Sequence, residues 1–350
     1  MAEQASRVLA ISMGEPAGIG TEILYKAYRQ LTDSDCCFFT FDDPDRLSNL
    51  PGSIRGSVKP IAITSARDAR SAFKEGLPVI PLSEKARANL STVSPGRPNA
   101  LTAHAVTESI EAGVDACLSG DASALITLPI QKSVLQEAGF AFPGHTEFLG
   151  DLLAHLPMPD GSARGPVMML AADGFRAVPA TVHLALRDVP SALKRERIVT
   201  HGLVTAQALQ RDFGVASPRL AIAGLNPHAG EDGRMGTEER EIIGPAILEL
   251  QAAGINAVGP MPGDTMFHPE ARTQYDAALA MYHDQALIPI KTVAFHDAVN
   301  VTIGLPIVRT SPDHGTGLDI AGRSIARPDS LIAAIRMANA MAKAREVRHA

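Results

Sequence analysis

The sequence predicts an α/β fold, an open sheet with helices on both faces, because short apolar segments of strand length alternate with stretches of helical spacing. The alternation begins near the N-terminus, where the apolar residues 8–12 lead into a glycine-rich turn and then into a helical pattern over residues 21–31. Thr21 is placed to cap that helix. With 350 residues, the chain can build one large domain or two domains of ordinary size.

Further strands are predicted at residues 124–128, 167–170, 180–184, 219–223 and 278–281. The first of them is followed by a helix from Gln131. Residues 157–166 are rich in proline and glycine, which indicates a loop or the base of a β-arm. The last helix is predicted from Asp329 to about Arg345, with apolar residues at helical spacing that would pack on a core.

Composition narrows the possible partners. The formal charge of −6 disfavours nucleic acid as the main ligand, although local cations can still bind an anionic metabolite. Cys36, Cys37 and Cys117 fit neither a disulfide framework nor a zinc-finger spacing, which favours reduced thiols. No segment reaches the roughly 20 apolar residues that span a bilayer. We therefore expect a cytoplasmic protein with no membrane partner.

Residues 275–291 are the most informative segment. A strand-like apolar run ends in the polar cluster His283, Asp284 and Gln285, and a second apolar run then leads to Lys291. Polar side chains delivered at the end of a buried strand are ordinary for a ligand site and costly for a purely structural element.

Histidines follow three of the expected strands. His183, His228 and His283 each lie at or just beyond the C-terminal end of a strand, which is the edge where open α/β sheets hold their ligands. Three neutral imidazoles meeting there would bind a divalent metal and leave positions open for a substrate. The alternative, that each is a hydrogen-bonded structural residue, stays open at this point.

Two groups of residues are candidates for binding an anion. His145 and Thr146 follow a Pro-Gly turn at a predicted helix start, where backbone N–H groups can hold a phosphate or carboxylate. The alternative is a capped helix without a ligand, in which the negative charge of Glu147 interacts favourably with the helix dipole. Lys291, Asn300 and Arg309 lie in or next to the mainly apolar residues 288–308. If Lys291 and Arg309 are buried, an anionic substrate would neutralise their charges. The alternative is that all three residues lie in solvated loops.

Two glycine-rich loops add weaker signals. Gly14, Gly18 and Gly20 do not form the G-x-G-x-x-G dinucleotide fingerprint, and a tight turn explains them equally well. Residues 309–322 form a long polar loop before the last helix, and loops of this length are often functional. No serine nucleophile elbow, Walker sequence or recognisable Cys–His motif occurs, which argues against the common hydrolases and NTPases.

Taken together, these segments resemble the 4-hydroxythreonine-4-phosphate dehydrogenase family of pyridoxal phosphate (vitamin B6) biosynthesis, over almost the whole chain. The matching motifs are residues 14–20, 142–147, 181–189, 225–236, 259–265, 275–292 and 304–322. Glu15 stands in place of the more usual Asp, and Thr21 in place of Pro.

The resemblance implies a fold like that of isocitrate and isopropylmalate dehydrogenases, with two α/β/α domains flanking an active-site cleft. The first domain would comprise residues 1–135 and 305–350, and the second, with the metal and dimer contacts, residues 136–304. The family forms homodimers whose active site uses both subunits, so that His283 would complete the site of a partner.

The resemblance also implies residue roles. The metal ligands would be His183, His228 and His283, and the substrate-binding residues His145, Thr146, Lys291, Asn300 and Arg309. The three histidines and Lys291 would be the catalytic residues. The cofactor, NAD or NADP, would bind the loop with His314, Gly315, Thr316 and Asp319. Asp264 and Asp284 are candidates for supporting the ligands or handling protons.

The implied reaction is an oxidation at CH–OH that depends on zinc, magnesium or cobalt. It converts 4-phosphohydroxy-L-threonine to 2-amino-3-oxo-4-(phosphonooxy)butanoate, which loses CO2 to give 3-amino-2-oxopropyl phosphate. One alternative is a paralogous dehydrogenase of a phosphorylated four-carbon sugar acid (4-phospho-threonate or erythronate) or of a cis-dihydrodiol acid. Another is a non-catalytic homologue, which the presence of all three histidines disfavours.

Overall fold

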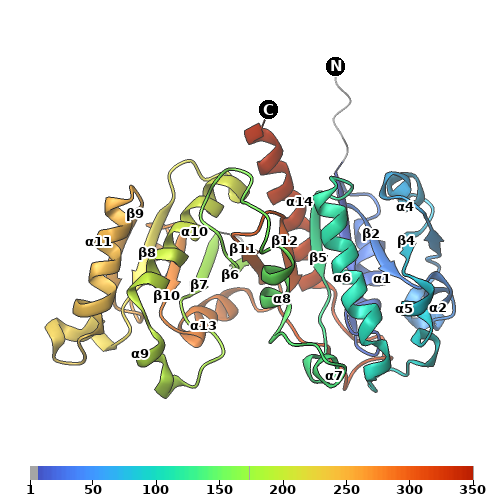
Figure 1. Cartoon of the computed structure of the whole chain (residues 1–350), viewed down its shortest axis with the longest axis horizontal. Coiled ribbons are helices and arrows are strands. Elements are labelled where there is room, and N and C mark those ends of the chain that lie inside the picture. The colour runs from blue at the N-terminus through green and yellow to red at the C-terminus, as the bar shows by residue number, and fades with distance from the viewer. Residues whose placement is uncertain (1–6, 173, 350) are drawn as a thin grey trace. The chain divides into compact units, whose positions relative to one another are not determined.

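The structure, a computed structural model, describes residues 7–172 and 174–349. The chain forms two compact units. One runs to Leu152 and continues over Ile307–Lys343, and the other comprises Leu153–Pro306 with Ala344–Ala350. Both units are built from strands with helices packed on them, which confirms the predicted α/β class (Figure 1).

The strands of the first unit are all parallel and lie in the order β3-β4-β2-β1-β5-β12. They are β1 (Val8–Ser12), β2 (Cys37–Asp42), β3 (Pro60–Ala62), β4 (Leu77–Pro81), β5 (Ala124–Thr127) and β12 (Arg309–Pro312). The chain passes from β1 to β2 on one side and later adds β5 on the other side of β1. Strand order therefore reverses between β1 and β5, and ligands bind at such a reversal, beyond the carboxyl ends of the strands.

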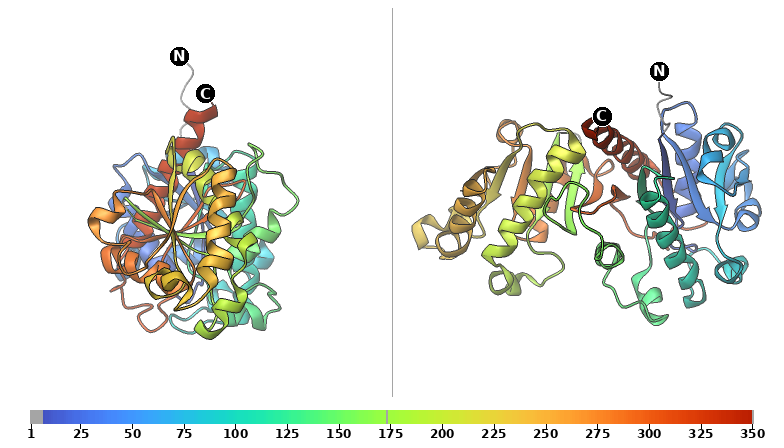
Figure 2. Two further views of the ribbon diagram at one scale, coloured as in Figure 1. Left: turned by 90° about the vertical axis from the view of Figure 1, so that its left-hand side faces the viewer. Right: turned by 45° about the horizontal axis from the view of Figure 1, so that its top comes forward.

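The longer helices of the first unit are α1 (Gly20–Leu31), α6 (Ala103–Leu118), α8 (His145–Leu152) and the first part of α14 (Asp329–His349). The short ones are α2 (Pro44–Ser48), α3 (Gly52–Arg55), α4 (Ala69–Phe73), α5 (Glu84–Arg87) and α7 (Lys132–Glu137). Helix α6 packs on β1, β2 and β5, as the right-hand view of Figure 2 shows. Gly113 permits this approach, because a Cβ there would lie 2.5 Å from Leu125 Cδ1.

The predicted helix over residues 21–31 is confirmed, but the expected cap is wrong. Helix α1 begins at Gly20, and its N-cap position is Ile19, which makes no side-chain cap bond. Thr21 lies inside the first turn, where its Oγ1 accepts a hydrogen bond from Arg46 Nη2 at 3.2 Å. The Thr21 hydroxyl therefore bonds a neighbouring segment and does not cap the helix.

The strands of the second unit lie in the order β11-β6-β7-β10-β8-β9. They are β6 (Val167–Ala172), β7 (Phe175–Pro179), β8 (Arg219–Ala223), β9 (Asn256–Met261), β10 (Ala277–Ala280) and β11 (Val299–Ile303). Strand β6 is antiparallel to β7 and to β11, whereas β7, β10, β8 and β9 are parallel. The carboxyl ends of β7, β10 and β8, which are neighbours, therefore open on the same edge.

One predicted strand, residues 180–184, is wrong, because β7 ends at Pro179 and the chain then leaves the sheet. Ala180 N–H still donates to Ala280 O at 2.7 Å, but at the next position the Thr181 hydroxyl donates to Met281 O at 2.7 Å. A side chain thus takes the place of the backbone ladder. Only Ala180 and Thr181 of this run are buried, and the chain becomes exposed from His183 onward, so the β-branched pattern does not mark a continuing strand.

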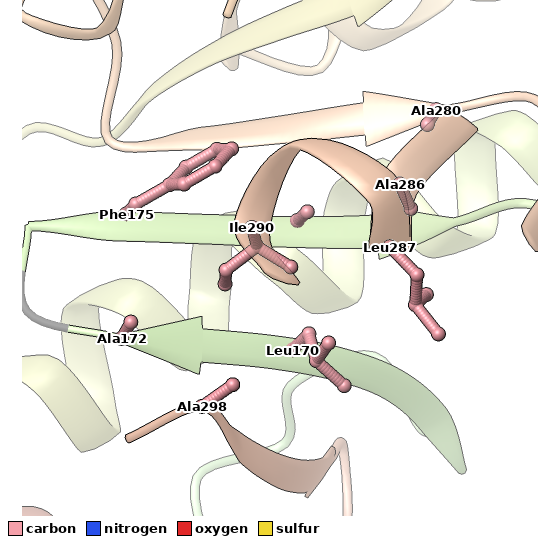
Figure 3. Packing of buried hydrophobic residues seen from close by; sticks show 9 residues of the cluster. Leu170, Ala172, Phe175, Ala280, Ala286, Leu287, Ile290 and Ala298 are labelled. Atoms are coloured by element: carbon pink, nitrogen blue, oxygen red, sulfur yellow. The ribbon is translucent and has the colours of Figure 1, made fainter. Parts of the chain in front are cut away.

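The helices of the second unit are α9 (Val189–Ala192), α10 (Arg195–Phe213), α11 (Gly244–Ala252), α12 (Pro269–Arg272) and α13 (His283–Ala294). Helix α13 lies on β6, β7 and β10, and Figure 3 shows Ala286, Leu287 and Ile290 directed at the apolar side chains of these strands. Each buried Leu or Ile contributes about 1.5–3 kcal/mol. This packing fixes the first residue of α13, His283, at the end of β10. Within the described ranges, no helix combines the length and apolarity needed to cross a bilayer.

Candidate active site

The three histidines follow three neighbouring strands of the second unit. His183 comes after β7, His228 after β8, and His283 begins α13 directly beyond β10. Ala278 of β10 pairs with Ala177 of β7 on one side and with Ala221 of β8 on the other. The parallel arrangement brings all three histidines to the same edge of the sheet.

His183 and His283 lie close together, with ring centroids 5.9 Å apart. The Nδ1 atom of His283 is 2.7 Å from Asp284 Oδ1, so the carboxylate orients this ring. Both histidines line a cavity of about 220 Å³ together with Thr181, Leu186 and Tyr282. The imidazole rings of His183 and His283 therefore line the same cavity.

His228 lines a neighbouring, larger cavity of about 510 Å³ with Asn226, Asp264, Asp284 and Gln285. Tyr282 and Asp284 line both cavities. In the part of the chain that the structure describes, no three His, Cys, Asp or Glu side chains are grouped closely enough to hold one metal ion. The structure thus brings His183 and His283 together, and places His228 on the same edge without joining it to that pair.

Gln285 connects the strand ends that carry the histidines. Its Oε1 accepts a hydrogen bond from Met281 N at 2.7 Å, and its Nε2 donates to Gly224 O at 2.7 Å. Met281 follows β10 and Gly224 follows β8, so the amide spans the two strand ends. Within the His-Asp-Gln cluster, Gln285 therefore has a structural role that the sequence did not indicate.

Lys291 and Asn300 lie further along the same unit. Lys291 is two turns beyond His283 on α13, is partly buried, and has its Nζ 5.6 Å from the centre of the Phe295 ring. Asn300 is a partly buried residue of β11, paired with Leu170 of β6. The apolar stretch that contains them is therefore a helix and a strand, not a loop.

A cluster of cationic and imidazole side chains lies in the first unit. Arg309, at the start of β12, is only 3% exposed, and its Nε and Nη2 donate to Thr127 Oγ1 at 3.2 and 2.5 Å. Burial lowers the pKa of Arg309 to about 9, although the Glu147 carboxylate opposes the shift. A charge buried under such conditions is stabilised by an anion.

His145, the first residue of α8, belongs to the same cluster. Burial, and then the charges of Arg309 and Lys132, hold the pKa of His145 well below its usual value. Its Nε2 is buried and has no hydrogen-bond partner among the described residues. Thr146 follows as the second residue of the helix, so the neutral ring and a hydroxyl stand at a helix N-terminus, where anions are favoured.

Lys132 is a functional candidate that sequence reasoning missed. It is the first residue of α7, which follows β5, and a Cβ on Gly144 would lie 3.4 Å from its Nζ and 3.5 Å from Glu147 Oε2. Lys132 therefore stands beside the turn that leads into His145. A single lysine at a helix start carries no pattern of its own, and only the fold reveals its neighbours.

The predicted cofactor loop packs against the first glycine loop. Ile19 N–H donates to Thr316 O at 2.9 Å, and Thr316 Oγ1 donates to Gln131 Oε1 at 3.0 Å. A Cβ on Gly18 would lie 2.7 Å from Thr316 O, which explains the glycine. These contacts thus join the segments that follow β1, β5 and β12, at the place where strand order reverses.

Within this loop, His314 Nδ1 lies 2.9 Å from Gly315 O, and its buried Nε2 has no hydrogen-bond partner among residues that the structure describes. Asp319 is exposed. Glu15, in the glycine loop, is 1% exposed, and burial raises the pKa of its carboxyl group. Its Oε1 accepts a hydrogen bond from Ala17 N at 3.0 Å, so the longer acid fits a tightly packed turn.

Comparison with known proteins gives a consistent result. Residues 34–338 match the family model described as pyridoxal phosphate biosynthetic protein PdxA. The chain is 55% identical to a 4-hydroxythreonine-4-phosphate dehydrogenase of Caulobacter vibrioides, over 98% of this chain and 99% of that protein.

Solved structures agree. A crystal structure of 4-hydroxythreonine-4-phosphate dehydrogenase from Klebsiella pneumoniae has a TM-score of 0.85 and 33% identity, and covers 97% of this chain and 99% of that one. A terephthalate 1,2-cis-dihydrodiol dehydrogenase from Burkholderia xenovorans is more distant, with a TM-score of 0.62 and 27% identity over 95% of this chain and 98% of that one.

These matches confirm the resemblance that the sequence motifs indicated. They extend from the first glycine loop to the last helix and leave no large part of the chain unmatched. The chain belongs to the PdxA family of pyridoxal phosphate biosynthetic proteins, the family of the 4-hydroxythreonine-4-phosphate dehydrogenases, and is an oxidoreductase.

Proposed function

We propose that the protein oxidises 4-phosphohydroxy-L-threonine to 2-amino-3-oxo-4-(phosphonooxy)butanoate with NAD or NADP, and that this product loses CO2 to give 3-amino-2-oxopropyl phosphate. We propose that the protein acts in the cytoplasm. The observation that carries the proposal is the cluster of the buried Arg309, the partly buried His145 and the exposed Lys132, in which two cations and an imidazole suit a phosphate group, in a chain of this family.

We propose that one divalent metal ion, zinc, magnesium or cobalt, binds His183, His228 and His283. Neutral imidazoles are preferred ligands of zinc and cobalt, and Asp284 already orients one of them. When bound, the ion would lower the pKa of the substrate alcohol and polarise the carbonyl that forms from it.

We propose further that the protein is a homodimer in which His228 and His283 of one site come from different subunits. The surface beside His183 and His283 supports this idea, because it exposes Leu184 (44%), Leu186 (68%) and Ile288 (62%). Exposed apolar side chains gathered around a polar site are typical of a surface that another chain covers.

A mixing experiment tests the shared site. His228→Ala and His283→Ala proteins, each inactive alone, would be dissociated and reassociated together. If the two ligands come from different subunits, each mixed dimer contains one intact site and one site that lacks both ligands, so activity returns. If activity does not return although mixed dimers form, each subunit carries a complete site of its own and the proposal is wrong.

The protein side chains would bind and orient the substrate. Arg309, His145, Thr146 and Lys132 would hold the phosphate, with His145 donating from a neutral ring. Lys291 and Asn300 would bind the amino acid end, and Lys291 is also placed to hold or move a proton near the reacting carbon. The loop with His314, Gly315, Thr316 and Asp319 would bind the dinucleotide, its shape fixed by the contacts with Ile19 and Gln131.

Two related reactions are the alternatives, oxidation of a phosphorylated four-carbon sugar acid and oxidation of a cis-dihydrodiol acid. A dihydrodiol acid has no phosphate to neutralise Arg309, which favours the phosphorylated substrates. Initial rates of NADH or NADPH formation with 4-phosphohydroxythreonine, 4-phosphoerythronate and a dihydrodiol acid decide among them. We expect kcat/KM to be at least about 100-fold higher for the first, a difference of about 2.7 kcal/mol. An equal or higher value for another substrate would assign the protein to that reaction.

A further inference from the structure

The segment that carries His228 has an unusual backbone. His228, Ala229, Gly230, Glu231 and Asp232 all have positive φ, between 42° and 80°, within a turn designated η5 (Pro227–Gly233). Every residue of the five except Gly230 has a Cβ, which makes left-handed backbone unfavourable. Such a run persists only where surrounding groups hold it, and strain of this kind is concentrated at functional sites.

The side chain of Glu239, which is 6% exposed, lies against this turn. Its Oε1 accepts a hydrogen bond from Asn226 N at 2.7 Å, and its Oε2 accepts one from Asn226 Nδ2 at 3.0 Å. Asn226 lies two residues before His228, so both bonds act at the entrance of the left-handed turn. Glu239 itself begins a π-helical turn, η6 (Glu239–Ile243), an irregularity that often occurs at functional sites.

Glycines leave room for this carboxylate on two sides. A Cβ on Gly230 would lie 2.6 Å from Glu239 Oε2, and a Cβ on Gly224 would lie 3.2 Å from Oε1. The carboxylate therefore fills the space between the end of β8 and the left-handed turn. A larger residue at Gly230 would displace it.

We propose that Glu239 is a positioning residue that holds His228 in the left-handed turn from which it binds the metal. The proposal rests on the proposed three-histidine site. Charge and shape both matter, because a carboxylate accepts bonds from both N–H donors of Asn226 whereas an amide can accept at only one oxygen. An amide at position 239 would set its own NH2 group against one of these donors.

The test compares Glu239→Gln with a matched control, Glu238→Gln. Glu238 Oε2 also accepts from Asn226 Nδ2, at 2.8 Å, but Glu238 bonds only the side chain and not the backbone N–H of Asn226. Each full-length protein is stripped of metal, and two quantities are measured: the dissociation constant for Zn²⁺ or Co²⁺, and amide hydrogen exchange over residues 226–236 without metal.

We expect Glu239→Gln to weaken metal binding about 10- to 100-fold and to increase exchange over residues 226–236, while exchange in α10 and in β8 stays as in the wild type. Glu238→Gln should change the dissociation constant less than about 3-fold, because the backbone bond remains. If Glu239→Gln leaves either metal affinity or exchange over residues 226–236 unchanged, the positioning role is wrong.

His228→Ala separates this inference from the proposed function. If the wild type binds no metal, or His228→Ala binds it as tightly as the wild type, the three-histidine site fails. If His228→Ala weakens binding and Glu239→Gln does not, only the positioning role fails. Should Glu239→Gln not fold, Gly230→Ala tests the same contact from the other side, and unchanged metal affinity in that folded variant would likewise contradict the proposal.

Discussion

Replacing Arg309 by methionine should make the protein more stable without ligand and less able to bind its substrate. Burial lowers the pKa of this guanidinium from its usual value to about 9. At pH 7–8 the group is still charged in the folded state, so the whole cost of burying the charge is present. The cost diminishes only as pH rises above the folded pKa, where the folded protein releases a proton that the unfolded chain keeps.

The size of the effect follows from that shift. The lowered pKa of Arg309 sets an upper limit of about 5 kcal/mol on the cost of burying its charge, at about 1.36 kcal/mol per pKa unit. Methionine also removes the bonds to Thr127 and leaves Glu147 without this cation, so we expect a net gain of about 1–2 kcal/mol in the free energy of unfolding. Substrate KM should rise roughly 100-fold, which corresponds to about 2.7 kcal/mol.

Urea unfolding at pH 7.5, with and without inorganic phosphate, measures both effects. Phosphate at 100 times its dissociation constant should stabilise the wild type by about 2.7 kcal/mol and the variant hardly at all. Arg67→Met, which removes an exposed arginine of the same unit, is the control and should keep the phosphate response. An Arg309→Met protein that is less stable than the wild type and is still stabilised by phosphate would show that the buried charge of Arg309 neither destabilises the protein nor binds phosphate.

Further predictions concern the remaining site residues and acid stability. Lys132→Met should raise the substrate KM about 10-fold with little change in kcat, because its cation acts on binding; a fall in kcat alone would show that Lys132 does not bind the phosphate. Asp284→Asn should weaken metal binding about 10-fold in a calorimetric titration, since the carboxylate orients His283; unchanged affinity would show that this contact is incidental. Burial lowers the pKa of His201 to about 4. The unfolded chain takes up this proton below about pH 6.5 and the folded protein does not, so unfolding free energy should fall by about 2 kcal/mol from pH 7 to pH 5, and less in His201→Gln.

Much of the fold is predictable because buried strands and amphipathic helices have different periods. The segments assigned to β1, β5, β6, β8 and β10 agree with the structure to within a few residues, as does the start of α14. Residues 180–184 fail, since the hydroxyl of Thr181 imitates a ladder bond to β10. The apolar residues 288–308 contain the end of α13 and all of β11, and an apolar composition by itself does not distinguish a helix from a strand.

The site is less predictable because its contacts join distant segments. The three histidines can be placed at strand ends from the sequence, and parallel pairing then brings them to one edge. Which strands are neighbours is not encoded locally, and neither are the positions of Lys132, Gln285 and Glu239. Each of these residues acts on a segment that only the folded chain brings near it.

The proposed function requires that this chain catalyse a metal-dependent oxidation of a phosphorylated hydroxy amino acid. The most direct measurement is the initial rate of NADH formation from 4-phosphohydroxythreonine by protein stripped of metal, before and after addition of Zn²⁺, Mg²⁺ or Co²⁺. We expect stripping to abolish the rate, at least one ion to restore it, and His283→Ala to remain inactive with every ion. An undiminished rate in the stripped protein, or full activity of His283→Ala, would contradict it.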